Sequence, residues 1–293
     1  MTRLGLDLGG TFIKWAAVDG NAVTGSGQLP THADRGPEAV LEALAEVGRG
    51  AVEVVGPVSA VGLGLPGLFD ASTETVRFLP NLPGRWGGVQ ITRALKQHLG
   101  APVRLVNDAR AFTLAEWRFG AARGASDAAF LVLGTGVGGG LVIDGGLHVG
   151  WDGTAGEIGH QTVDPDGPLC GCGNHGCVEV FASASAITAR AGTASVEAAV
   201  SKAERGDPQA CAALEFAARA LGIGIANVVA TLAPQVIVIG GGVAQAGEVL
   251  FAPIRAELAQ RVSFRPSLPR VLRAELGAIA GAVGAALYAG SGQ

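Results

Sequence analysis

Three of the chain's four cysteines lie within eight residues, in the segment CGCGNHGC that runs from Cys170 to Cys177. Glycines separate Cys170, Cys172 and Cys177, so the loop bends easily, and a disulfide that joins Cys170 to Cys172 would be strained. Three thiolates on such a loop can bind one face of a tetrahedral zinc ion, and a fourth protein ligand would make the site structural. Both His175, inside the loop, and His160, ten residues before Cys170, are candidates for that ligand. The alternative is a set of reduced, buried thiols, which this spacing disfavours.

Each of three short apolar strands is followed by a cluster of glycines. The segments are 3–19 (RLGLDLGGTFIKWAAVD), 128–145 (AAFLVLGTGVGGGLVIDG) and 234–244 (PQVIVIGGGVA). Glycines at such turns let backbone N–H groups approach an anion closely, and a threonine adds a hydroxyl donor. No P-loop lysine follows and no Rossmann pattern opens a helix, so each cluster alone could be an ordinary turn. Together and in this order they predict a site for the phosphates of a nucleotide.

The candidate nucleotide ligands are mostly glycines of these turns. They are Gly9, Gly10, Thr11, Lys14, Gly134, Thr135, Gly136, Gly138, Gly241 and Gly242. Asp7 ends the first strand, where a carboxylate can hold a hydrated magnesium ion beside the phosphates.

A polar pair, Asn107 and Asp108, directly follows the apolar strand in PVRLVNDARAF and precedes a helix. Asp108 could cap that helix by accepting the amides of its first turn. In α/β sheets, however, the carboxyl ends of strands are where ligands gather. A carboxylate there could accept the proton of an attacking hydroxyl, and Asp108 is therefore our candidate general base.

The elements that would position these residues alternate between strands and helices. Apolar residues resume directly after the first two glycine clusters, which predicts a strand, a tight turn and a second strand. Segments 3–19 and 128–145 share this pattern about 125 residues apart, which indicates two related halves. Predicted helices cover residues 37–48, 90–99, 109–119, 198–230 with a break at 206–208, and 279–289. The pattern is typical of an α/β protein, which we divide into residues 1–116 with the helix at 278–293, and residues 117–277.

Composition excludes several classes of protein. The net charge is −4, 48% of residues are hydrophobic, and no basic segment suggests binding to nucleic acid. The apolar stretch 221–244 is long enough to raise the question of a membrane span, but Pro234 and three glycines interrupt it. We predict a helix, a break and a buried strand there. Clustered cysteines favour a reducing compartment, so we expect a cytoplasmic protein that binds no membrane.

The motifs LDLGGTFIKWAAVD, LVNDARAFTLAEW, LGTGVGGGLVIDG, GEIGHQTVDPDGPLCGCGNHGCVE and VIVIGGGVA resemble, in this order, those of the ROK family of bacterial sugar kinases. The resemblance covers nearly the whole chain. Its Gly-Glu-x-Gly-His and Cys-x-Cys-Gly-x-x-Gly-Cys-x-Glu blocks are highly specific to the family. It implies the two-domain α/β fold of the actin-like ATPases, which includes heat-shock proteins and sugar kinases, with ATP bound in a cleft between duplicated halves.

The resemblance also implies roles for individual residues. It favours His160 over His175 as the fourth zinc ligand, and it makes Asp108 the base for the 6-hydroxyl of a sugar. The ring hydroxyls would be held by Asn107, Glu157, His160 and Glu179, with Gly67 and Asn81 as further sugar contacts. Many relatives place a lysine immediately after the threonine of the first turn, whereas Lys14 stands three residues after Thr11.

We therefore predict an ATP:hexose 6-phosphotransferase that uses ATP, Mg²⁺ and a structural Zn²⁺, with glucose as its substrate. Alternative substrates are an N-acetylhexosamine, mannose or fructose, and polyphosphate is an alternative donor. A sugar-responsive repressor is a second class, but the first strand begins by residue 4, which leaves no room for the winged helix that such repressors carry. A binding protein in which Asp108 only caps a helix is a third. Relatives are commonly dimers or tetramers, so we expect a homo-oligomer.

Overall fold

The computed structural model describes residues 1–70, 73–80 and 82–290. Asn81, one of the predicted sugar contacts, lies outside the described residues. The chain forms two compact units: residues 1–119 with 278–293, called unit 1 here, and residues 120–277, called unit 2. The join predicted near residue 116 falls inside a helix that continues to Arg118.

Unit 1 is built on a five-stranded sheet with the order β3-β2-β1-β4-β7. Its strands are β1 (Arg3–Leu8), β2 (Phe12–Asp19), β3 (Ala22–Pro30), β4 (Ala60–Leu65) and β7 (Val103–Asn107). β1 pairs antiparallel with β2 and parallel with β4, and β4 pairs parallel with β7. A separate hairpin is formed by β5 (Leu68–Asp70) and β6 (Thr75–Phe78).

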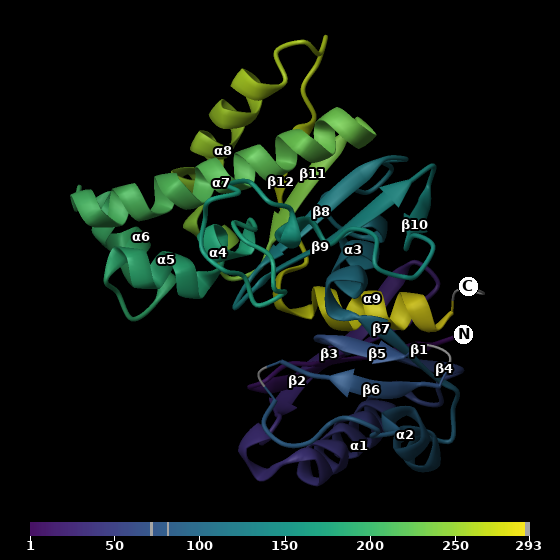
Figure 1. The fold of residues 1–293 in the computed structure, drawn as a ribbon. Helices are drawn as coiled ribbons and strands as arrows, with labels where there is room; N and C mark the ends of the chain where they lie inside the picture. Colours follow the sequence, from purple (N-terminus) through teal and green to yellow (C-terminus); the bar gives the residue numbers. More distant parts are fainter. Residues whose placement is uncertain (71–72, 81, 291–293) are drawn as a thin grey trace. The chain divides into compact units, whose positions relative to one another are not determined.

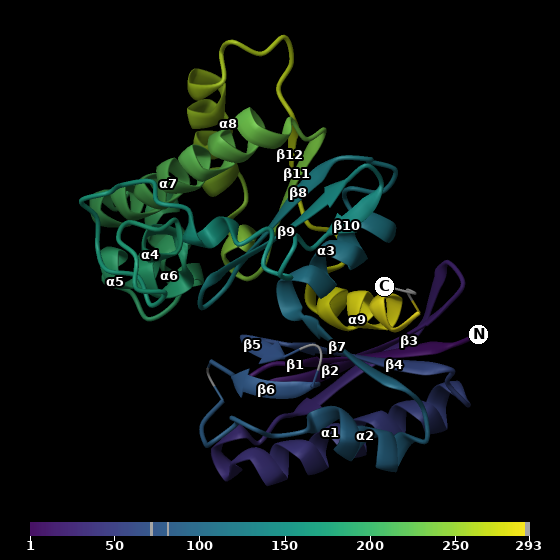
Figure 2. The ribbon, with the colours of Figure 1, turned by 45° about the vertical axis from the view of Figure 1, so that its right-hand side comes forward.

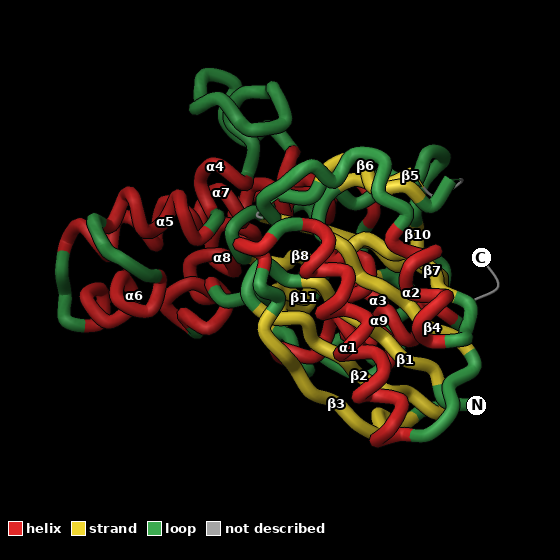
Figure 3. The backbone as a smooth tube through the Cα atoms, turned by 90° about the horizontal axis from the view of Figure 1, so that it is seen from below, coloured by secondary structure: helices red, strands yellow, loops and turns green. Residues whose placement is uncertain are grey.

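Helices cover both faces of this sheet. They are α1 (Pro37–Val55), α2 (Ile91–Leu99), α3 (Asp108–Arg118) and α9 (Ala280–Ala289), with a 3₁₀ turn at Ala33–Arg35. Figures 1 and 2 show α9 on one face and α1 with α2 on the other. In the view of Figure 3, α1 lies in front of β1 and β2. The apolar residues of α1 and α2 join those of the strands in one core.

Glycines allow α9 to lie directly on its neighbours. A Cβ on Gly5 of β1 would come within 1.8 Å of the carbonyl oxygen of Ala282 in α9. A Cβ on Gly284 of α9 would come within 1.6 Å of the carbonyl oxygen of Ala111 in α3. These distances leave no room for a side chain at either glycine. Helix α9 therefore packs directly against β1 and α3.

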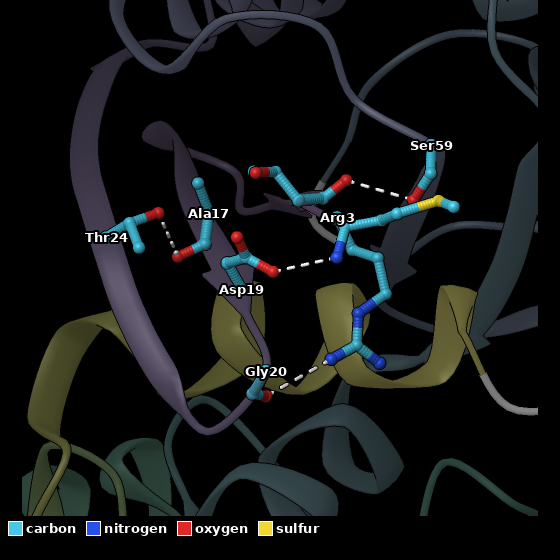
Figure 4. Close-up of polar contacts among 8 residues, drawn as sticks. Arg3, Ala17, Asp19, Gly20, Thr24 and Ser59 are labelled. Carbon is cyan, nitrogen blue, oxygen red and sulfur yellow. Dashed lines mark hydrogen bonds and ion pairs between the residues drawn. The ribbon is translucent and has the colours of Figure 1, made fainter.

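Polar contacts at the amino end of β1 link it to the end of β2 and to the residue before β4 (Figure 4). The N-terminal amino group lies 2.8 Å from a carboxylate oxygen of Asp19, and this ammonium lowers the pKa of that carboxyl. Arg3 donates to the carbonyl of Gly20, and Ser59 donates to the carbonyl of Thr2. Because β1 and β2 run antiparallel, these contacts lie at the edge away from the glycine turn that joins the two strands.

Unit 2 repeats the sheet arrangement of unit 1. Its order is β10-β9-β8-β11-β12, with antiparallel pairing of the first three strands and parallel pairing of the last three. The strands are β8 (Ala128–Leu133), β9 (Val137–Ile143), β10 (Gly146–His148), β11 (Val236–Gly240) and β12 (Arg270–Arg273). The hairpin β8–β9 corresponds to β1–β2, and this confirms the prediction of two related halves.

The helices of unit 2 centre on one long apolar helix. They are α4 (Glu179–Ala182), α5 (Ala184–Ala191), α6 (Val196–Glu204), α7 (Pro208–Leu232) and α8 (Glu248–Arg261), with 3₁₀ turns at Ile158–His160 and Val243–Ala246. A further 3₁₀ turn, Gly277–Ile279, lies where the chain passes from unit 2 to unit 1. α7 packs against α8, α5 and α6 (Figure 1). By length and composition α7 could cross a membrane, but 67% of its apolar window is buried within the structure, so α7 is a core helix.

The predicted helices and their breaks agree with the structure at most places. The break at 206–208 separates α6 from α7, and the stretch 221–244 is a helix, a break and the buried strand β11, as predicted. The predicted end of the first helix at residue 48 is wrong, because α1 continues to Val55 and ends at Gly56. Gly48 instead packs against Leu99 of α2, whose side chain a Cβ at this position would meet at 2.8 Å.

Candidate functional site

The carboxyl ends of three parallel strands bring the candidates of unit 1 to one edge of its sheet. Asp7 of β1 pairs with Gly64 of β4, and Leu65 of β4 pairs with Asn107 of β7. The first glycine turn, Gly67 and Asp108 follow at the ends of β1, β4 and β7, respectively. The sheet therefore gathers residues that are about 100 positions apart in the sequence.

The first glycine turn is held by its own backbone and by a threonine. The N–H of Gly9 donates to the carbonyl of Phe12 at 3.1 Å. Thr31, fully buried after β3, donates its hydroxyl to the carbonyl of Gly9 at 2.7 Å and its N–H to the carbonyl of Thr11 at 2.9 Å. The amides of Gly10 and Thr11 make no hydrogen bond to any described residue, and both residues are exposed. They can therefore donate to an anion.

The carboxylate of Asp7, two residues before Gly9, lies beside the first residues of α9. A Cβ on Gly281 would lie 2.5 Å from one of its oxygens. Burial raises the pKa of Asp7, and the charge of Lys14, which faces Asp7 across the β1–β2 pair, opposes that increase. Lys14 thus acts on the carboxylate, and a cation bound at Asp7 would stabilise its ionised form.

The structure divides the roles of the polar pair at the start of α3. Asn107 is the N-cap: its side-chain oxygen accepts the amides of Ala109 at 3.0 Å and Arg110 at 3.2 Å. Asp108 is the first residue of the helix, and one of its carboxylate oxygens accepts the Ala109 amide at 2.8 Å. The N-cap is therefore Asn107, and Asp108 shares the amide of Ala109 with it.

Gly67 follows β4 at the same edge, in a left-handed conformation with φ of 87°. A Cβ there would lie 2.5 Å from both the carbonyl oxygen of Phe78 and the ring of Pro80. Glycine at this position is thus explained by the close approach of the end of β6 and of Pro80 after it.

Unit 2 brings the second and third glycine clusters together. The N–H of Gly134 donates to the carbonyl of Gly136 at 2.9 Å, which closes the turn that presents Thr135 to solvent. A Cβ on Gly241, just after β11, would lie 2.2 Å from the carbonyl oxygen of Leu133 at the end of β8. A Cβ on Gly134 or on Gly242 would meet no atom within 4 Å, so both border open space. Gly138 lies one residue inside β9, opposite Val132.

His160 and the three clustered cysteines form a group with the dimensions of a metal site. Their candidate ligand atoms all lie within 4.8 Å of one another. The sulfurs of Cys172 and Cys177 are 3.7 Å apart, as are the sulfur of Cys170 and Nδ1 of His160. A tetrahedral zinc ion with Zn–S bonds of about 2.3 Å requires sulfurs roughly 3.8 Å apart. The group therefore fits zinc, and the distance between the sulfurs of Cys172 and Cys177 is too long for a disulfide.

His175, the alternative fourth ligand, points elsewhere. Its Nδ1 lies 3.0 Å from the carbonyl oxygen of Gly167, and its residue is exposed. Gly176 beside it has φ of 60°, and a Cβ there would lie 1.5 Å from the carbonyl oxygen of Asp164. The loop is therefore folded back tightly on itself in a conformation that brings His160, and not His175, to the cysteines.

The thiols differ in their readiness to ionise. Burial raises the pKa of Cys177 to about 12 and also raises the pKa of Cys170. The pKa of exposed Cys172 is lowered, chiefly because its thiolate accepts a hydrogen bond from the backbone N–H of Asn174. Metal binding would have to displace protons from the two buried thiols.

The Gly-Glu-x-Gly-His block packs its glycines against β9. A Cβ on Gly159 would lie 1.9 Å from the carbonyl oxygen of Val137, and one on Gly139 would lie 2.2 Å from that of Gly156. Glu157, between the two block glycines, is exposed. His160 is held because its N–H donates to the carbonyl of Glu157 at 3.1 Å.

Glu179 does not behave as a solvated surface charge. It is half-buried, and one carboxylate oxygen accepts the N–H of Val137 at 2.9 Å, directly after the second glycine turn. The other oxygen lies 3.7 Å from the sulfur of Cys170. Sequence reasoning missed this link, as it missed Thr31, because both join residues that are distant in the sequence.

Comparison with known proteins agrees with this arrangement. The model of the ROK family matches residues 3–291. A glucokinase from Thermotoga maritima is 38% identical over 277 residues, which cover 87% of this chain and 86% of the relative. An N-acetylmannosamine kinase from Escherichia fergusonii is 36% identical over 301 residues, which cover 99% of this chain and 98% of the relative.

Solved structures show the same fold. A ROK hexokinase from Thermus thermophilus has 39% identity and a TM-score of 0.89, over 99% of this chain and 98% of that one. A ROK glucokinase from Streptomyces griseus, solved in complex with glucose and AMPPNP, has 34% identity and a TM-score of 0.84, over 99% of both chains. The duplicated sheets are those of the actin-like sugar kinase fold, and the chain belongs to the ROK family.

Proposed function

We propose that this chain transfers the terminal phosphoryl group of ATP to the 6-hydroxyl of a hexose, and that its hexose is glucose. Relatives named as glucokinases, similar over most of the chain, support this activity. The observation that carries the mechanism is that Asn107 is the N-cap of α3, which makes Asp108 the first residue of the helix, directly after β7. Asp108 follows a strand at the sheet edge that also carries the first glycine turn.

The reaction needs one proton acceptor and several donors. Asp108 accepts the proton of the sugar 6-hydroxyl while that oxygen bonds to the terminal phosphorus of ATP. The bond from this phosphorus to the bridging oxygen breaks, and ADP leaves with the electron pair. The products are hexose 6-phosphate, ADP and the proton held by Asp108.

The phosphates of the nucleotide would be bound mainly by backbone N–H groups. The exposed amides of Gly10 and Thr11 are available at the first turn, and Thr135 offers a hydroxyl at the second. Charge on the transferred group is stabilised by such fixed donors without reorganisation. Asp7 would hold the magnesium ion that accompanies ATP, and that ion would offset the negative charge of the phosphates.

The sugar ring would be held by polar side chains from both sequence blocks. We assign this role to Asn107, Glu157, His160 and Glu179, with Gly67 as a backbone contact. Asn107 keeps its amide N–H₂ group for a sugar hydroxyl while its oxygen caps α3.

We assign structural zinc to His160, Cys170, Cys172 and Cys177. The fit of their mutual distances to a tetrahedron supports this assignment. Four protein ligands leave no open position for substrate, so the ion would order the loop and take no part in phosphoryl transfer. A thiol-rich site of this kind suits a reducing compartment, and we place the protein in the cytoplasm.

N-acetylmannosamine is the second candidate substrate, because an N-acetylmannosamine kinase covers 99% of this chain at 36% identity. The test is ADP release by the purified, zinc-loaded chain with glucose, N-acetylmannosamine, N-acetylglucosamine, mannose and fructose, each with ATP or polyphosphate. The proposal expects the highest kcat/KM with glucose and ATP. Greater efficiency with N-acetylmannosamine would replace glucose as substrate, and no transfer to any hexose would refute the kinase assignment.

We also propose that the chain forms a homo-oligomer and binds no nucleic acid. Light scattering during gel filtration should give a mass of two or four chains. A monomer at micromolar concentration, or retarded migration of DNA by the protein, would contradict these two assignments.

A further inference from the structure

The segment that follows Cys177 contacts the second glycine turn at both ends of the turn. At the start of the turn, the N–H of Ala184 donates to the carbonyl of Gly134 at 2.8 Å. At its end, Glu179 accepts the N–H of Val137 at 2.9 Å. A Cβ on Gly136 would lie 2.5 Å from the same carboxylate oxygen of Glu179, so the carboxylate lies directly against the turn.

This segment is itself fixed by the metal-binding loop. Cys177 is fully buried two residues before Glu179, and the N–H of intervening Val178 donates to the carbonyl of Gln161 at 3.0 Å. The backbone of Cys177 also forms an isolated antiparallel β-bridge with that of Thr162. The position of Glu179 thus depends on the loop that ends at Cys177.

The residue before His160 contacts Val137 as well, on the opposite side of Val137 from Glu179. Gly159, next to His160, has its Cα so close to the carbonyl of Val137 that a Cβ would lie 1.9 Å from that oxygen. Val137 is therefore contacted from its N–H side by Glu179 and from its carbonyl side by Gly159. Both contacts come from residues within two positions of the proposed zinc ligands.

We propose that Glu179 is a positioning residue that transmits the order of the zinc loop to the second glycine turn, so that nucleotide binding depends on zinc. The inference rests on the proposed function, since it requires that the turn bind nucleotide phosphates. Its physical basis is that a preformed turn binds an anion without the cost of ordering itself. Loss of zinc frees Cys177 and His160, which releases both contacts on Val137.

The experiment measures the affinity for Mg²⁺ and a non-hydrolysable ATP analogue by calorimetry, in the absence of sugar, on the full chain. Zinc-loaded protein is compared with protein stripped by a chelator that is then removed by dialysis. Wild type should bind about tenfold more weakly after stripping, since one hydrogen bond to a charged group carries this order of affinity. Zinc-loaded Glu179→Ala should already be about tenfold weaker, and stripping it should add less than about twofold.

Two further variants separate positioning from a general loss of structure. Glu179→Gln keeps an oxygen that can accept the Val137 amide, and it should restore most of the affinity. Glu204→Ala, which removes an exposed glutamate of α6, is the matched control and should bind like wild type. Circular dichroism establishes that each variant is folded before titration.

Two results would overturn the inference while leaving the kinase assignment intact. One is wild-type affinity in zinc-loaded Glu179→Ala, and the other is an equal loss on stripping in Glu179→Ala and wild type. If the zinc-loaded wild type bound no nucleotide at all, both the inference and the proposed function would fail.

Discussion

The buried hydroxyl of Thr31 donates to the carbonyl of Gly9 at 2.7 Å, across 22 positions of sequence. Together with the bond from the Thr31 N–H to the carbonyl of Thr11, this bond turns the carbonyls of Gly9 and Thr11 toward Thr31. The amides of Gly10 and Thr11 are consequently left for a ligand.

Thr31→Val should weaken ATP binding while leaving sugar binding intact. Valine keeps the shape but leaves the Gly9 carbonyl without its donor, a loss of about 1–3 kcal/mol. We expect the KM for ATP to rise about tenfold with an unchanged KM for the sugar, and Thr31→Ser to recover the wild-type value. A wild-type KM for ATP in Thr31→Val, or a KM in Thr31→Ser that is raised as much as in Thr31→Val, would contradict a role for this hydrogen bond.

Asp7→Asn should increase stability and reduce phosphoryl transfer. Burial raises the pKa of Asp7 above its ordinary value, so the folded state holds its proton more tightly than the unfolded chain. The free energy of unfolding therefore falls as the pH rises from the ordinary carboxyl pKa through the raised one, and Asp7 is destabilising at neutral pH. Removing the charge should increase that free energy by about 1 kcal/mol at pH 7 and reduce turnover about 100-fold or more.

Urea unfolding at pH 7 and at acidic pH, with ADP release, measures both effects of Asp7→Asn. The difference from wild type should shrink at acidic pH, where Asp7 is protonated. Asp34→Asn, at an exposed carboxylate of the same unit, is the control and should change little. A destabilised Asp7→Asn at neutral pH would contradict the argument from burial.

His160→Gln and His175→Gln should differ in zinc content. His160 lies among the three cysteines, whereas His175 points to the carbonyl of Gly167. Metal analysis of purified protein should give about one zinc ion per chain for wild type and His175→Gln, and much less for His160→Gln. The melting temperature should fall together with zinc content. Zinc loss confined to His175→Gln would reverse the ligand assignment.

Gly284→Ala should destabilise unit 1. The added methyl would lie 1.6 Å from the carbonyl oxygen of Ala111, and it would force α9 away from α3 at a cost of about 2–3 kcal/mol. Gly50→Ala is the matched control, since it adds the same methyl to helix α1 where nothing lies within 4 Å. That change should stabilise by about 0.5–1 kcal/mol. Equal urea midpoints for the two variants would contradict the close packing of α9.

Features that depend on neighbouring residues could be predicted from the sequence. Both glycine hairpins, the break before α7 and the cysteine cluster are set by local turn chemistry and spacing, and the structure has them at the expected positions. The predicted end of α1 at Gly48 was wrong because a glycine can either end a helix or allow two helices to approach closely. Only the contact with Leu99 shows that Gly48 does the second.

Links through tertiary contacts could not be predicted. Thr31 and Glu179 reach turns that lie 22 and 42 positions away. No local pattern marks Thr31, and the block that marks Glu179 does not indicate its contact with Val137. The capping role of Asn107 was hidden for a different reason: either residue of the Asn107–Asp108 pair has a suitable side chain, and the exact start of α3 decides which one caps.

Glucose-dependent ADP release by Asp108→Asn, measured beside glucose binding by calorimetry, tests the central claim most directly. The account predicts that transfer falls about 100- to 10,000-fold, because the 6-hydroxyl loses its proton acceptor, while the glucose dissociation constant changes by less than about threefold. Wild-type turnover in Asp108→Asn would contradict the assignment of Asp108 as the base.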